Sequence, residues 1–131
     1  MSTPAPLVTG VDFVTVATSD FEAAMGFYGE VLGLRCSVRY GRVPGAEFET
    51  GNLTLQVIHS ETAGLQHRPN PHPVALHVED VHAAREELEC RGVSFNGETL
   101  DTGVCHMAFF SDPDGNAWML HHRYAPRVSQ D

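Results

Sequence analysis

Histidine is the residue type in this chain that most plainly could do chemistry. The sequence holds eight histidines in 131 residues, and an imidazole can bind a metal, transfer a proton or donate a hydrogen bond near neutral pH. His77 and His121 lie in two segments that read as strands, and strand parity places both on faces that we expect to line a pocket. Three roles stay open for this pair: polar contacts in a pocket, side chains at the rim of a sheet, or a metal or acid–base pair.

Other pairs of reactive side chains combine less well. His121 and His122 are adjacent in a predicted strand, so their side chains point to opposite faces and cannot chelate one ion together. Cys105 and His106 diverge for the same reason, which argues against a Cys–His catalytic pair. The three cysteines are widely spaced and form no C-x-x-C motif. We interpret them as small buried apolar residues of a chain in a reducing compartment.

Charge and length restrict the function classes. The net charge is −9, and the eight basic residues are all arginine without a basic cluster, so neither nucleic acid nor an anionic membrane is an expected partner. The apolar runs are too short to span a bilayer. Residues 1–6 lack the basic and apolar regions of a signal peptide, which predicts a cytoplasmic location. A chain of 131 residues suits one compact domain or two small fused modules.

The elements that must position the histidines follow from side-chain periodicity. In the first half, a strand is expected over 10–18, and a helix begins at the S-x-x-E capping box, with Ser19 as its N-cap, and ends before Gly33. Strands over 34–40, 46–50 and 53–59 follow, and a polar stretch with prolines reads as a linker. In the second half the expected elements are, in order, a strand 73–78, a helix 81–91 capped by Asp80, a strand beginning at 93–95, a turn-rich stretch 96–102, and a hairpin of 104–111 and 117–122.

The two halves repeat one pattern. VATSDFEAA resembles HVEDVHAA, with Asp20 and Asp80 in step, and FETGNLTLQV resembles FSDPDGNAWML. A fixed offset of about 60 residues indicates an internal duplication. We therefore predict a first module over 10–61, a linker over 62–72 and a second module over 73–123.

The predicted fold class is α+β, with two tandem βαβββ modules forming a curved mixed sheet, a cup with the helices on its convex side. The more apolar face of each first strand should pack on the helix that follows, so the opposite face lines the cup, which makes a natural ligand pocket. The cup-facing residues that we predict to contact a ligand are Phe13, Thr15, Gln56, Ile58, Ala75, His77, Met119 and His121. This lining is apolar and partly aromatic, which favours a small hydrophobic or aromatic molecule.

The sequence also resembles a known family. VDFVTVATSDFEAAMGFYGEVLGL resembles the opening βα unit of the vicinal oxygen chelate superfamily, ALHVEDVHAA its second strand-to-helix unit, and DPDGNAWML its closing hairpin. The superfamily includes glyoxalase I, extradiol dioxygenases, epimerases and bleomycin-resistance proteins. The likeness covers residues 10–123. It implies the duplicated fold and a homodimer, but the fold hosts several chemistries.

The resemblance also implies where a metal would lie. The metal-dependent members bind one divalent ion through four strand positions, which fall here on Phe13, Gln56, Pro73 and Met119. Only Gln56 offers a hard oxygen donor, and the thioether of Met119 is a soft ligand. A catalytic divalent site takes three or more nitrogen or oxygen ligands. We therefore expect no metal at these positions and no cofactor.

These observations predict metal-independent binding of a small hydrophobic or aromatic molecule by a homodimer. Catalytic residues are not assigned, and whether the chain is an enzyme stays open. The alternative is a metal-dependent lyase, dioxygenase or epimerase of the same superfamily with relocated histidine ligands. A third possibility is a structural domain whose dimer, rather than its cup, matters.

Overall fold

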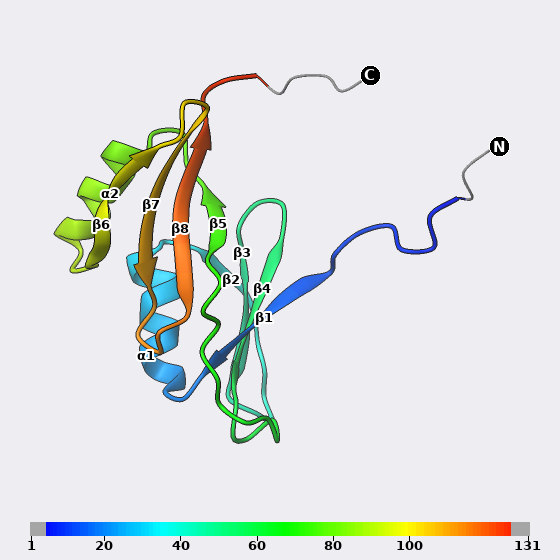
Figure 1. Cartoon of the computed structure of the whole chain (residues 1–131). Helices are drawn as coiled ribbons and strands as arrows, with labels where there is room; N and C mark the ends of the chain where they lie inside the picture. Colours follow the sequence, from blue (N-terminus) through cyan, green and yellow to red (C-terminus); the bar gives the residue numbers. More distant parts are fainter. Residues whose placement is uncertain (1–4, 127–131) are drawn as a thin grey trace.

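The computed structural model describes residues 5–126 and shows two groups of strands with helical segments beside them (Figure 1). The elements of the first module are β1 (Phe13–Thr18), α1 (Phe21–Gly26), the π-helical η1 (Phe27–Val31), β2 (Arg35–Arg39), β3 (Gly45–Glu49) and β4 (Thr54–His59). Those of the second are β5 (Val74–His77), α2 (Val81–Cys90), β6 (Phe95–Asp101), β7 (Cys105–Ser111) and β8 (Ala117–Arg123). The predicted tandem βαβββ order is confirmed.

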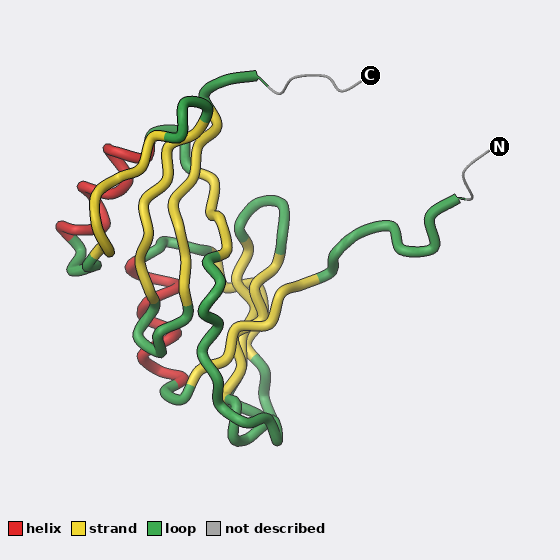
Figure 2. The backbone as a smooth tube through the Cα atoms, in the orientation of Figure 1, coloured by secondary structure: helices red, strands yellow, loops and turns green. Residues whose placement is uncertain are grey.

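The strands form two four-stranded mixed sheets, in the orders β1-β4-β3-β2 and β5-β8-β7-β6 (Figure 2). In each sheet the first strand of the module pairs in parallel with the last one, so that Thr15 lies opposite Gln56, and Ala75 opposite Met119. The α+β class is thus confirmed, and the curved sheet expected from the duplication is divided into these two sheets. No helix within residues 5–126 has the length and apolarity needed to cross a membrane. Residues 1–4, which belong to the segment on which the signal-peptide expectation rests, lie outside the described part.

One apolar core joins the two sheets. It contains Phe48 and Leu55 from the first sheet, Trp118 and Leu120 from the second, and the fully buried Tyr28 of η1. The ring centroid of Tyr28 lies 5.9 Å from that of Phe48 and 5.9 Å from that of Trp118. We call the sheet face that carries these core residues the inner face, and the face that carries the alternate residues the outer face. The predicted packing of the more apolar parity against the helices is confirmed.

Both helices begin at an aspartate. The carboxylate of Asp20 accepts a hydrogen bond from the backbone N–H of Ala23 at 3.1 Å, and Asp80 caps α2 in the same way. The prediction of Ser19 as N-cap was wrong. The backbone N–H and the hydroxyl of Ser19 both donate to Asp114 Oδ1 at 2.7 Å, so this residue ties the start of α1 to the β7–β8 turn instead.

The segment 96–102 is mostly strand, so the predicted turn was wrong here. β6 extends through it to Asp101, and its register with β7 shifts between Asn96 and Leu100. Gly97 has a φ of 73°, a conformation that glycine adopts without steric cost. The turn-forming residues therefore make a bulge inside the strand rather than a break in it.

A buried polar network fastens the β7–β8 turn to the first module. The hydroxyl of Tyr28 donates to Asp112 Oδ2 at 2.5 Å and accepts from Trp118 Nε1 at 3.1 Å. Asp112 also accepts from the backbone N–H and the side-chain amide of Asn116, each at 2.8 Å. The amide of Asn116 donates in addition to the Ala17 carbonyl at the end of β1 at 2.9 Å. The DPDGN turn is thus a structural tether between the modules.

Replacing Tyr28 with phenylalanine should change how stability depends on alkaline pH. Burial, and then the charge and hydrogen bond of Asp112, raise the pKa of Tyr28 well above its ordinary value. The stabilising contribution of the protonated phenol is complete below about pH 10 and is lost as the pH rises further, because the unfolded chain releases this proton and the folded chain keeps it. We expect unfolding free energies measured with urea to fall more steeply above about pH 10 in the wild type, by up to ~1.4 kcal/mol per pH unit, than in Tyr28→Phe. Equal slopes would contradict the raised pKa.

Candidate functional site

The outer face of the first sheet carries a chain of polar contacts. The hydroxyl of Thr15 donates to Gln56 Oε1 at 3.0 Å, and Gln56 Nε2 donates to the Tyr40 hydroxyl at 3.1 Å. Tyr40 in turn donates to Glu47 Oε2 at 2.5 Å. Burial and the hydrogen bond to Glu47 raise the pKa of Tyr40. Both ends of the Gln56 amide are therefore engaged by the protein itself, and its oxygen is a poor candidate for a metal ligand.

Gly45 leaves the space that Tyr40 needs in this network. A Cβ atom at residue 45 would lie 2.5 Å from Tyr40 Cδ2 and 3.0 Å from Tyr40 Cε2. We expect Gly45→Ala to displace the ring, break its contacts with Glu47 and Gln56, and lower the unfolding free energy by about 1–2 kcal/mol. Gly41→Ala is the matched control, because a Cβ there meets nothing within 4 Å. Urea denaturation of both variants is the measurement, and equal stabilities would show that Tyr40 adapts at no cost.

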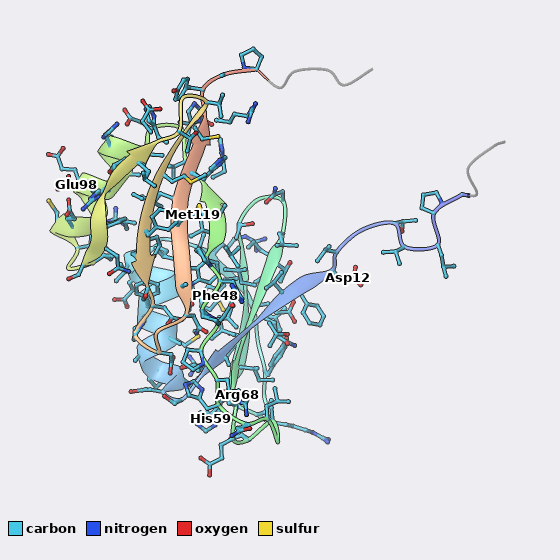
Figure 3. The ribbon with its side chains drawn as sticks, viewed as in Figure 1. Asp12, Phe48, His59, Arg68, Glu98 and Met119 are labelled. Atoms are coloured by element: carbon cyan, nitrogen blue, oxygen red, sulfur yellow. The ribbon has the colours of Figure 1, made fainter. Side chains whose placement is uncertain are left out.

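The four positions that the resemblance assigns to metal ligands are divided between the sheets. Phe13 and Gln56 belong to β1 and β4, whereas Pro73 precedes β5 and Met119 lies on β8. Figure 3 shows Met119 well apart from the labelled Asp12, the residue that directly precedes β1. Phe13 is 48% exposed, and Met119 lies between Ala75 and Phe109 in its sheet. Three of these four side chains offer no nitrogen or oxygen donor.

A cavity lies elsewhere, between the two sheets and α2. Its volume is about 520 Å³. Its wall is mostly aliphatic and includes Leu53 of the turn before β4, Leu55 of β4, Leu76 of β5 and Leu88 of α2. Polar side chains in the wall are Thr50, Asn52, His77, Glu87 and Arg91. Of the ligand contacts predicted from the sequence, Ala75 and His77 line this cavity, since β5 is an edge strand.

The other six predicted contacts do not line it. Thr15 and Gln56 are joined by the hydrogen bond described above, and His121 lies beside Met107 on β7. The residues concerned lie on the outer faces of the two sheets: Phe13, Thr15, Gln56, Ile58, Met119 and His121. The structure thus gathers them into two separate groups.

The cavity lies where the two repeats differ in side-chain size. Asp20 and Asp80 cap equivalent helices, and the residues at the same distance along them are Tyr28 and Leu88. In one half, Tyr28 packs against Trp118 and the turn that contains Asp112. In the other half, Leu88 is smaller and has no hydroxyl, so space remains between it and the 50–53 turn. The difference between Tyr28 and Leu88 is visible in the sequence repeat, but only the structure shows that a cavity lies beside Leu88.

The side chain of His77 has a different histidine neighbour from the one opposite it in the backbone register. Backbone register places His77 opposite His121, a pairing that parity alone does not predict. The ring centroid of His77 nevertheless lies 5.8 Å from that of His122. His77 is the last residue of β5, so its side chain lies at the end of the strand beside β8.

Comparison with known proteins places this fold in context. Residues 10–120 match the family model described as the glyoxalase/bleomycin resistance protein/dioxygenase superfamily. No curated protein sequence matches the chain. A putative glyoxalase family protein from Bacillus anthracis superimposes with a TM-score of 0.77 at 22% identity, over 92% of this chain and 99% of that one.

Two further solved structures differ in what their names describe. TnmS3, an antibiotic binding protein from Streptomyces sp. CB03234, is 25% identical over 91% of this chain and 99% of its own, with a TM-score of 0.76. A lactoylglutathione lyase from Agrobacterium tumefaciens is 16% identical over 88% of this chain and 95% of its own, with a TM-score of 0.72. A binding protein and an enzyme thus share this fold.

Proposed function

Because the chain belongs to the glyoxalase/bleomycin resistance protein/dioxygenase superfamily and contains a largely aliphatic cavity, we propose that it binds a small hydrophobic or aromatic molecule, without a metal at the family position. The cavity carries this proposal. Its volume of about 520 Å³ falls within the range of roughly 300–1,000 Å³ typical of small-molecule sites.

The residues at the family's metal positions support binding without that metal. Phe13, Pro73 and Met119 provide no nitrogen or oxygen ligand, and the amide of Gln56 is held by Thr15 and Tyr40. A single neutral amide does not hold a catalytic divalent ion. TnmS3, described as an antibiotic binding protein, shares the fold and supports the small-molecule binding part of the proposal.

The polar part of the wall suggests the shape of the ligand. Arg91 brings a guanidinium to the cavity. Its Nε donates a hydrogen bond to Glu87 Oε1 at 3.1 Å, and its Nη1 donates to the Val31 carbonyl at 2.8 Å. These partners fix the orientation of Arg91 and leave other N–H groups to donate. We propose a ligand with an aromatic or aliphatic body and one acidic or strongly accepting group.

The dye 1-anilinonaphthalene-8-sulfonate has this combination and provides the test. We expect saturable fluorescence enhancement with one dye per chain in the folded protein, and displacement of the dye by the true ligand. Bound ligand at a hundredfold excess over Kd should raise the unfolding free energy by about 2.7 kcal/mol. Folded protein that gives no saturable signal, and no shift in midpoint with any small aromatic molecule, would contradict the proposal.

A homodimer is part of the proposal, because the outer faces of the sheets leave large apolar side chains uncovered. Phe13 is 48% exposed, Val38 43% and Leu100 50%. A second copy on these faces would bury them and would close the cup that the sequence predicts around Thr15, Gln56, Ile58, Met119 and His121. Light scattering should give about twice the chain mass of 14.3 kDa for the wild type and a lower mass for Phe13→Glu. A monomeric mass at every concentration would contradict the dimer.

A cytoplasmic location agrees with the cysteines. The expectation that the three cysteines are buried holds for Cys105 but was wrong for Cys36 and Cys90, which are exposed, and none of the three forms a disulfide. Exposed free thiols suit a compartment that glutathione and thioredoxin keep reduced.

A further inference from the structure

His77, Glu79 and His122 gather at the end of the second sheet, next to the start of α2. One ligand atom from each residue lies within 4.8 Å of the others, and no other such group of three occurs in the described residues 5–126. His77 Nε2 and Glu79 Oε1 are 3.1 Å apart. None of the three occupies a position that the family uses for its metal.

The backbone explains how they come together. β5 ends at His77, and Glu79 lies in the bend that follows, where its carboxylate comes within 3.1 Å of His77 Nε2. The Val78 N–H donates to the His121 carbonyl at 3.0 Å, which continues the β5–β8 ladder past His77 and holds Glu79 beside it. Asp80 then caps α2, so both neighbours of this short segment are fixed.

The side chains are not otherwise engaged in the described part of the molecule. The His122 Nδ1 atom is buried without a hydrogen-bond partner there. Glu79 is 88% exposed at its side chain, and its hydrogen bond is to His77. Leaving a buried ring nitrogen unpaired is costly, and a metal bound at Nδ1 itself would supply the missing partner.

We propose that His77, Glu79 and His122 bind one divalent transition-metal ion of the zinc class. Two imidazole nitrogens and one carboxylate oxygen are ligands that zinc, cobalt and nickel accept. Metal–ligand bonds of about 2.0–2.2 Å place tetrahedral ligand atoms roughly 3.4 Å apart, so small side-chain rotations close the site. The chain's net charge of −9 also favours a cation.

The proposed ion would retain an open coordination position beside the cavity. His77 belongs both to this site and to the cavity wall, whereas Glu79 and His122 belong to the site alone. The metal site does not depend on the cavity's ligand, and variants of Glu79 and His122 separate the two functions.

Calorimetric titration of the full chain with Zn²⁺ tests the site, with absorption spectra of Co²⁺ as a second readout. We expect one ion per chain, at least about tenfold weaker binding in His122→Ala and Glu79→Gln, and changed Co²⁺ absorption bands. Glu79→Gln keeps the shape of an exposed side chain, so a folding defect does not obscure its result. His121→Ala is the matched control, because residue 121 is adjacent on β8 but points to the outer face.

The outcomes divide cleanly. Zinc binding that is absent in the wild type, or unchanged in both His122→Ala and Glu79→Gln, would overturn the metal site. Equal weakening by His121→Ala would overturn it too, since that result assigns the ion to other histidines. Dye binding by His122→Ala should equal that of the wild type, so failure of the metal proposal leaves the cavity proposal standing.

Discussion

Asp112→Ala is expected to lower the unfolding free energy by about 3–5 kcal/mol, which is a large share of the stability of a domain this size. Asp112 is 6% exposed. It accepts hydrogen bonds from the Tyr28 hydroxyl and from the backbone and side chain of Asn116. The alanine would leave these donors buried and unpaired, and each unsatisfied group costs about 1–3 kcal/mol. Part of the tether between the modules would be lost with them.

Urea denaturation followed by fluorescence measures this effect, because Trp118 is the single tryptophan and donates to Tyr28 within the same network. Asp101→Ala is a suitable control. Asp101 is also an aspartate that accepts from a tyrosine, at 2.7 Å from the Tyr124 hydroxyl, but it is exposed. We expect its loss to cost about 1 kcal/mol or less. Similar losses for the two variants would show that the buried network adds no special stability.

The sequence predicted the place of this turn but not its role. Turn formers between two apolar segments indicate a hairpin at 112–116, and β7 and β8 confirm it. The partner of Asp112 lies on a helical segment of the other module, 84 positions away in the chain. Strand and helix periodicity describe local faces only, so they cannot show which distant hydroxyl meets a carboxylate.

Local competition explains the errors at the element ends. Both Ser19 and Asp20 are residue types that cap helices. Asp20 is the N-cap here, whereas Ser19 donates a hydrogen bond to Asp114. Similarly, Gly97 signals a turn in any local reading, although pairing with β7 keeps the chain in a strand. These are tertiary contacts that override local preference.

The predicted ligand contacts were chosen by strand parity alone, which gives the face of a side chain but not its partner strand. The register shows that Thr15 lies opposite Gln56 and Ala75 opposite Met119. Whether the predicted residues contact a ligand stays a prediction. The cavity was missed because it lies where Tyr28 and Leu88 differ in side-chain volume, whereas parity treats the repeats as equal. The approach of His77 to His122 was missed because parity does not say which side chains lie beside the end of a strand.

Ala84→Phe should weaken binding of the naphthalene dye by about 10- to 100-fold, which corresponds to roughly 1.4–2.7 kcal/mol. Ala84 is half-buried on α2, and its side chain lines the cavity. A phenyl ring would occupy space that the ligand needs. It would also gain contacts with the aliphatic wall, so the unfolding free energy should stay equal or rise by up to about 1 kcal/mol. Dye titration together with urea denaturation measures both effects.

Ala83→Phe is the matched control for this substitution. Ala83 is the preceding residue of the same helix, but it is exposed and does not line the cavity. The same ring added there should leave dye affinity within about twofold of the wild type, because residues one apart on a helix point in different directions. Equal loss in both variants would place the dye on the exposed surface of α2. No loss in either would place it outside the cavity, and the outer faces of the sheets would then become the better site for the ligand.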